Sequence, residues 1–138
     1  MGAWDDSANS GLRERVPGDV GVLVVDDQVA FRSLLRELVI ATDGFVLVGE
    51  AASGEDALSA VEALAPQMVI MDKRMPGMGG IEATRVLTGR HPEIAVILIS
   101  VEDPPDAQIV RSSGAAAFVH KERLSPAVLQ EVWRSYAA

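Results

Sequence analysis

The sequence contains no cysteine. This absence excludes a disulfide framework, a metal site built on thiolates and a cysteine nucleophile. It also favours a reducing compartment, because disulfides persist mainly in oxidising ones. The fold must therefore rest on an apolar core, and the 49% share of hydrophobic residues is normal for a globular protein.

Basic residues are scarce relative to acidic ones. Twelve Lys and Arg residues stand against 20 Asp and Glu residues, which gives a formal net charge of −8 and a pI near 4.6. Nucleic acid and anionic membranes require a basic surface, so neither is an expected partner. No apolar run approaches the roughly 20 residues of a membrane helix, and residues 1–10 lack a signal-peptide arrangement. We expect a soluble cytoplasmic protein.

A length of 138 residues corresponds to one domain. Residues 1–19 show no periodicity and hold mainly Gly, Ser, Asn, Asp and Arg. We expect a flexible leader there and a folded domain over residues 20–138. For Trp4, an incidental exposed position in the leader is favoured over docking on the domain.

From residue 20 onward, short apolar runs alternate with helical patterns. Strands are predicted at 20–25, 45–48, 67–72, 94–99 and 116–119. Helices are predicted over 31–39, 54–65, 81–87 and 106–112, and a last one follows Ser125 as its cap. The apolar stripe of the first helix consists of Phe31, Leu34, Leu35, Leu38 and Val39.

The alternation predicts an α/β fold, in which right-handed crossovers build a parallel sheet with helices on both faces. Ligands bind in such folds beyond the carboxyl ends of the strands. The first strand ends in Asp26 and Asp27, the third in Asp72, the fourth in Ser100 and the fifth near Lys121. We therefore expect these side chains to converge at one edge of the sheet.

Clustered carboxylates raise one another's pKa, and a hard divalent cation relieves the repulsion. Mg²⁺ is the expected ion, because it binds oxygen ligands and commonly shares its site with a phosphate oxygen. Zinc is a poor candidate, since the chain offers no cysteine and its two histidines are far apart in the sequence. We interpret His91 as a surface loop residue and His120 as a structural residue at a strand end.

An aspartate is also a nucleophile that accepts phosphoryl groups. Phosphoryl transfer requires mainly positioning and charge neutralisation, and Ser100 and Lys121 are suitable donors to the phosphoryl oxygens. Taken singly, each residue has an ordinary explanation: a strand-ending Asp often caps the next helix, and a single Ser or Lys is usually a surface residue. Their joint placement at strand ends favours a phosphoryl-accepting site.

Four segments together resemble the signature of receiver domains of bacterial two-component response regulators. They are residues 24–28 (VVDDQ), 71–80 (MDKRMPGMGG), Ser100 and 117–121 (AFVHK). The resemblance covers about residues 20–136. It implies a flavodoxin-like (βα)5 fold, a doubly wound parallel sheet with strand order 2-1-3-4-5. Residues 48–51 and 121–126 are most similar to receivers of the NarL/LuxR type.

The resemblance assigns Asp72 as the phosphoacceptor. Asp27 resembles the direct Mg²⁺ ligand and Asp26 its water-mediated companion, and the backbone carbonyl of Arg74 would complete the metal site.

The resemblance also assigns a switch. Ser100 resembles the hydroxyl that donates to the phosphoryl group, and Lys121 resembles the lysine that pairs with it. Phe118 resembles the aromatic residue that turns inward when Ser100 moves toward the phosphate. Without the motif, plain core packing would be the favoured reading of Phe118.

The sequence departs from the family pattern beside these residues. Gly79 replaces a common aspartate, so a helix cap is lost. Val101 stands where small residues are usual, and we expect it to narrow access to Asp72 and slow the reaction. Arg74 and Glu102 occupy variable positions on the rim of the active site, and we expect an ion pair between them across its mouth.

The resemblance implies a receiver that is phosphorylated by a sensor histidine kinase or a histidine phosphotransfer protein. Because the sequence shows no output domain after the receiver, we expect it to act as a stand-alone receiver. The modified form would engage a downstream protein target. Receivers of the NarL/LuxR type normally carry a DNA-binding domain, so a fragment of a longer protein is the alternative to a stand-alone receiver. Catalysis would be self-directed, covering only the receiver's own phosphorylation and dephosphorylation.

Other functions fit the sequence less well. A phosphorylation-independent interaction scaffold is supported only by Val101. A Mg²⁺-dependent phosphatase of the haloacid dehalogenase type would usually carry a second aspartate where Arg74 stands. A flavin or nucleotide binder would need a glycine-rich phosphate loop after the first strand, and none is present.

Overall fold

The computed structural model describes residues 18–137, so Trp4 and nearly all of the predicted leader lie outside the described residues. Within that range, strands and helices alternate along the chain. In order, they are β1 (Val20–Val25), α1 (Val29–Ile40), β2 (Phe45–Ala51), α2 (Gly54–Leu64), β3 (Met68–Asp72), α3 (Gly80–Arg90), β4 (Ala95–Ser100), α4 (Ala107–Ser113), β5 (Ala117–His120), the 3-10 turn η2 (Lys121–Arg123) and α5 (Pro126–Ala137).

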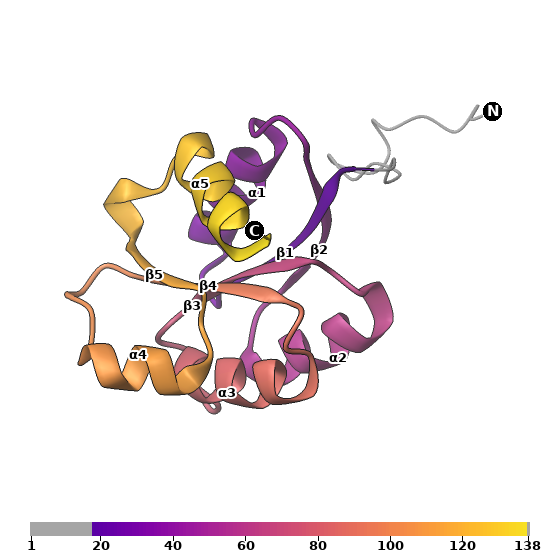
Figure 1. Ribbon diagram of the computed structural model, residues 1–138. Helices are drawn as coiled ribbons and strands as arrows, with labels where there is room; N and C mark the ends of the chain where they lie inside the picture. The colour runs from indigo at the N-terminus through magenta and orange to yellow at the C-terminus, as the bar shows by residue number, and fades with distance from the viewer. Residues whose placement is uncertain (1–17, 138) are drawn as a thin grey trace.

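The strands form one parallel sheet in the order β2-β1-β3-β4-β5. Helices α1 and α5 cover one face, and α2, α3 and α4 cover the other (Figure 1). The predicted α/β fold and its strand order are therefore confirmed.

Two apolar clusters hold these layers together, one on each face of the sheet. In β1, Val22 and Val24 pack toward the α1 and α5 side, whereas Leu23 and Val25 belong to the cluster under α2 and α3. This alternation explains why the strand is apolar at nearly every position, because both faces of a sheet covered in this way are buried. Burial of apolar side chains on both faces of the sheet thus fixes the positions of the helices around it.

Side-chain caps begin several helices where the sequence indicated them. The Ser53 hydroxyl accepts a hydrogen bond from the Asp56 N–H at 3.0 Å, and the Ser125 hydroxyl accepts one from the Val128 N–H at 3.2 Å. Asp106, predicted inside the fourth helix, is instead its N-cap and accepts from the Gln108 N–H at 2.7 Å. At α3, Gly79 offers no side-chain cap, which confirms the predicted loss.

The predicted inner face of the first helix is wrong at one position, because the Leu34 side chain is 61% exposed. Leu35 and Val39 mark the buried direction of α1, and adjacent helical residues are separated by about 100° around the axis. Leu34 therefore points away from the sheet.

The boundaries of β2, β3, β4 and β5 also differ from the prediction, by one to three residues. Strand β2 continues to Ala51, beyond the predicted end at residue 48, because its pairing with β1 runs as far as Val25 and Ala51. Strand β5 is shifted by one residue and is only half-buried, since it lies at the edge of the sheet with β4 as its neighbour.

Within residues 18–137, every helix is too short or too polar to span a membrane.

The start of α3 lies directly against the strand end that carries Asp72. The Gly80 N–H donates to the Lys73 carbonyl at 2.9 Å. A Cβ atom at Gly80 would lie 2.1 Å from the backbone carbonyl oxygen of Asp72. Only glycine permits this approach, so Gly80 fixes how closely α3 packs beside Asp72.

We predict that Gly80→Ala destabilises the fold by about 1–3 kcal/mol, because the added methyl group meets backbone atoms that must shift. Gly89→Ala in the same helix is the matched control. Nothing lies within 4 Å of a Cβ atom there, so replacing this helical glycine should stabilise the fold by about 0.5–1 kcal/mol. Urea unfolding measures both, and equal effects at the two positions would contradict the close approach.

Candidate functional site

A cleft of about 730 Å³ opens at the carboxyl ends of the strands. Most of the predicted site residues line it: Asp27, Asp72, Arg74, Ser100, Val101, Glu102 and Lys121. Asp26 lies beneath them and is fully buried. The sheet thus brings together residues that are almost 100 positions apart in the sequence.

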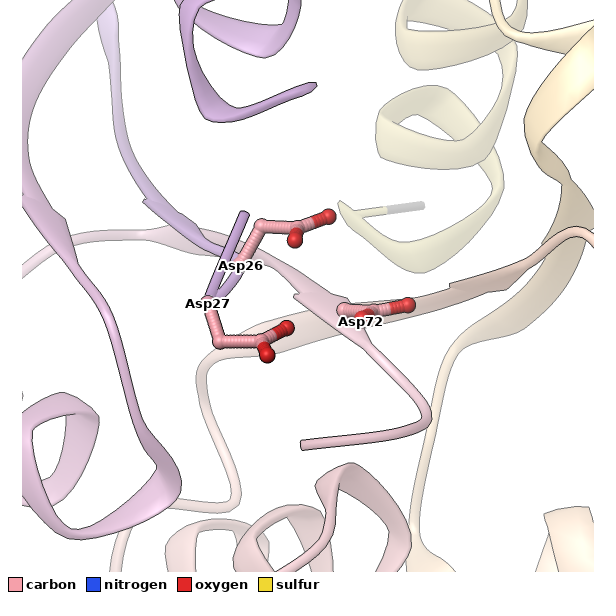
Figure 2. A group of neighbouring side chains, drawn as sticks. All are labelled: Asp26, Asp27 and Asp72. Atoms are coloured by element: carbon pink, nitrogen blue, oxygen red, sulfur yellow. The ribbon is translucent and has the colours of Figure 1, made fainter. Parts of the chain in front are cut away.

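Three carboxylates are grouped at the base of this cleft, two of them lining it and the third buried beneath. Asp26 and Asp27 follow β1 and Asp72 ends β3, and Figure 2 shows the three side chains grouped at these two strand ends. One oxygen from each carboxylate lies within 4.8 Å of the others. The grouping arises because β1 and β3 are paired neighbours, with Val25 opposite Met71 at their ends.

The Lys121 ammonium lies among these carboxylates. Its Nζ atom donates to Asp26 Oδ2 at 3.0 Å and lies 3.4 Å from Asp72 Oδ1. The same atom lies 4.0 Å from the centre of the Phe31 ring. Lys121 thus offsets part of the negative charge that the fold concentrates here.

Burial raises the pKa of Asp72 above its ordinary value, and the negative charge of Asp26 raises it further. The charge and hydrogen bond of Lys121 act in the opposite direction but do not cancel these effects. The folded protein therefore disfavours the ionised form of the Asp72 carboxyl group. A positive charge beside it would stabilise that form.

The residues fit the predicted magnesium ion. The donor set consists of carboxylate oxygens, which suit a hard cation, and it includes none of the sulfur or imidazole ligands that zinc prefers. The carboxylates are already gathered, and a cation bound beside them would reduce the repulsion from Asp26, which together with burial raises the pKa of Asp72.

An ion-pair network spans the rim of the cleft. Glu102 Oε1 lies 3.0 Å from Arg74 Nε and 3.2 Å from Lys73 Nζ. The hydrogen bond from Lys73 and the nearby charge of Arg74 hold the pKa of Glu102 below its ordinary value. The predicted pairing of Arg74 with Glu102 is confirmed, and Lys73 is an additional partner that the sequence reasoning missed.

The loop after β4 is tied down at two further points. The Ser100 hydroxyl accepts a hydrogen bond from the Glu102 N–H at 3.0 Å. His120 Nε2 lies 2.8 Å from the Val101 carbonyl oxygen, and its Nδ1 accepts from the Glu122 N–H at 3.2 Å. This second bond places the ring proton on Nε2, so His120 donates to the loop and has the structural role predicted for it.

The remaining predicted residues lie around the cleft. The Val101 side chain is 68% exposed at the rim. Phe118 is half-buried on β5 and packs against the apolar cluster under α2 and α3. His91 does not line the cleft; it hydrogen-bonds Glu62 at 2.6 Å, which raises the His91 pKa.

Sequence reasoning missed two contributors to this site besides Lys73. Gly80 belongs to the quoted motif, but its contact with the Asp72 backbone follows from how α3 packs. Phe31 belongs to an apolar helical stripe, which gave no signal beyond core packing.

Comparisons with known proteins agree with this geometry. Residues 22–133 match the family model of the response regulator receiver domain. Response regulator GacA of Pseudomonas viridiflava is 41% identical over 104 residues, which cover 74% of this chain and 48% of GacA. Response regulator UvrY of Escherichia coli K12 is 33% identical over 120 residues, covering 86% of this chain and 55% of UvrY. The chain thus spans about half the length of these relatives.

A solved structure shows the same fold. The LuxR-family two-component response regulator from Aurantimonas sp. SI85-9A1 has a TM-score of 0.77 and 28% identity, with 86% of each chain covered. The strand order, the acidic cluster at the strand ends and the match over residues 22–133 lead to one conclusion: this chain belongs to the response regulator receiver domain family.

Proposed function

We propose that Asp72 accepts a phosphoryl group from a sensor histidine kinase or a histidine phosphotransfer protein. One observation carries the proposal: Asp72 ends β3 in an open cleft, 3.4 Å from the Lys121 ammonium and grouped with two further carboxylates. Membership of a family of signalling domains supports it. The receiver would then signal to a downstream protein target.

In the proposed step, a carboxylate oxygen of Asp72 attacks phosphorus. The bond between phosphorus and the donor histidine nitrogen breaks, and its electron pair remains on the imidazole. Lys121 would then pair with a phosphoryl oxygen. Ser100 would donate to another, because its hydroxyl accepts the Glu102 N–H and its own proton is not used in that bond.

Asp26, Asp27, Asp72 and the backbone carbonyl of Arg74 would hold Mg²⁺. When bound, the ion would supply positive charge beside the transferred phosphoryl group. The protein residues keep the carboxylates gathered and present the donors. The same arrangement would serve both phosphorylation and hydrolysis of the product, so catalysis would be self-directed.

The switch would pass through Ser100 and Phe118 to the surface formed by α4, β5 and α5. Moving a two-state protein from 1:99 to 99:1 requires about 5.5 kcal/mol. Hydrogen bonds to a charged group contribute roughly 1.5–3 kcal/mol each. Two or three new bonds to the phosphoryl group are therefore of the size needed to rearrange the β4–α4 loop.

Several finer expectations belong to this proposal. The receiver would act in the cytoplasm and would itself contact neither membrane nor nucleic acid, in keeping with its acidic charge. Action as a stand-alone receiver stays a prediction, because the chain spans about half the length of its curated relatives.

We predict that incubation with Mg²⁺ and acetyl phosphate adds one labile phosphoryl group, visible by intact-mass spectrometry, and that Asp72→Asn abolishes it. An adduct that persists in Asp72→Asn would move the acceptor elsewhere. If the wild type forms none, Val101→Ala decides between two causes. A gained adduct would show that Val101 blocks small donors, whereas continued absence would favour a phosphorylation-independent scaffold.

We predict that Asp72→Asn raises the melting temperature at pH 7 in the absence of divalent ions. The raised pKa of Asp72 means that its ionised form costs folding free energy. This cost is absent below the ordinary pKa of 3.8, where the carboxyl is protonated in both states, and grows as pH rises through the folded pKa. The stabilisation should therefore shrink toward pH 3.5, and thermal unfolding at several pH values measures it. A pH-independent difference would contradict this electrostatic origin.

We predict that Lys121→Ala permits some phosphorylation but removes the phosphorylation-dependent change in amide NMR spectra. Without the ammonium, the phosphoryl group lacks one of the donors that couple it to β5. Spectra recorded before and after phosphorylation of both proteins provide the test. An unchanged spectral response in Lys121→Ala would refute the role of this lysine.

A further inference from the structure

The Lys121 ammonium contacts an aromatic ring as well as carboxylates. Its side chain is only 12% exposed, with Asp26 Oδ2 at 3.0 Å, Asp72 Oδ1 at 3.4 Å and the Phe31 ring centre at 4.0 Å. A cation within about 6 Å of a ring centre is attracted by the electron-rich face of the ring. Phe31 is therefore an electrostatic partner of Lys121 as well as a packing residue.

The fold places Phe31 there through the first turn of α1. Asp26 and Asp27 follow β1, α1 begins at Val29, and Phe31 lies in the first turn of that helix. The half-buried ring packs against the apolar cluster on the α1 and α5 side of the sheet. One short segment thus supplies two acidic residues of the site and an uncharged partner for the opposing lysine.

The three partners of Lys121 differ in how they respond to phosphorylation. When Asp72 becomes an acyl phosphate, its carboxylate charge is lost and negative charge moves to the phosphoryl oxygens. A metal ion beside Asp26 would compete with the ammonium for that carboxylate. The attraction of the ammonium to the ring depends on neither the Asp26 nor the Asp72 charge, so the ring can hold the ammonium before and after phosphoryl transfer.

We propose that Phe31 is a positioning residue, whose ring holds the Lys121 ammonium where it meets the incoming phosphoryl group. The inference rests on the proposed function of Asp72. Lysine has high rotamer freedom, and holding its ammonium in place beforehand reduces the entropy lost when it pairs with phosphate. The ring also covers one side of the ammonium that water would otherwise occupy.

The test compares Phe31→Leu, which keeps apolar bulk but removes the ring, with Phe31→Tyr, which keeps the ring. We expect Phe31→Leu to slow formation of the acetyl phosphate adduct roughly two- to tenfold in the full chain, as loss of a cation–π contact implies. Phe31→Tyr should restore most of the rate. A wild-type rate for Phe31→Leu, or a rate for Phe31→Tyr as slow as that of Phe31→Leu, would overturn the proposal.

Phe45→Leu is the matched control. Phe45 belongs to the same apolar cluster, but it begins β2, the outer strand on the opposite side of the sheet from β5. It should leave the rate unchanged although it also removes a core ring. If Phe45→Leu slows the reaction as much as Phe31→Leu, the effect arises from general loss of packing and the proposal fails.

A double-mutant cycle with Lys121→Ala shows whether Phe31 acts through the lysine. We expect Phe31→Leu to have little further effect once Lys121 is alanine, whereas the same fold-change in both backgrounds would overturn the proposal. Ring-current shifts of the Lys121 Hε protons, present in the wild type and absent in Phe31→Leu, test the contact without any phosphodonor. Failure of both the wild type and Val101→Ala to form an adduct would instead count against the proposed function of Asp72.

Discussion

The structure concentrates negative charge that it does not fully neutralise. Asp26, Asp27 and Asp72 are held together because paired neighbouring strands end level with one another, and the packed layers on both faces of the sheet prevent them from separating. Lys121 supplies the nearest positive charge, yet the pKa of Asp72 remains raised. The core therefore holds mutually repelling carboxylates close together, and added positive charge at the cleft would reduce their repulsion.

Around these carboxylates, the polar contacts lie in loops whose ends are anchored in the packed core. The loop after β4 is held by Ser100, by the Glu102 pairs with Lys73 and Arg74, and by His120. These contacts are polar and lie near solvent, so they exchange at much lower cost than the buried apolar clusters. Under the proposed function, a charge change at Asp72 would reorganise the loop and leave the sheet intact.

Alternating apolar runs and helical stripes were enough to predict the parallel sheet and the acidic cluster at its strand ends, and the family resemblance supplied the strand order. The sequence was enough to predict five site residues, because a parallel sheet brings strand ends to one edge; they are Asp26, Asp27, Asp72, Ser100 and Lys121. Strand and helix boundaries were less accurate. The end of β2 depends on pairing with β1, and the exposure of Leu34 depends on how α1 rotates against the sheet.

The sequence by itself determined the fold class and that the residues at the strand ends meet at the cleft, because local periodicity and chain order are sufficient for both. Only the tertiary structure decided which charges and rings touch. Lys121 reaches Asp26 across 95 positions of sequence and also lies over the Phe31 ring, and Glu102 pairs with Lys73 as well as Arg74. Such contacts depend on side-chain directions, which packing sets to within an ångström and which no linear pattern specifies.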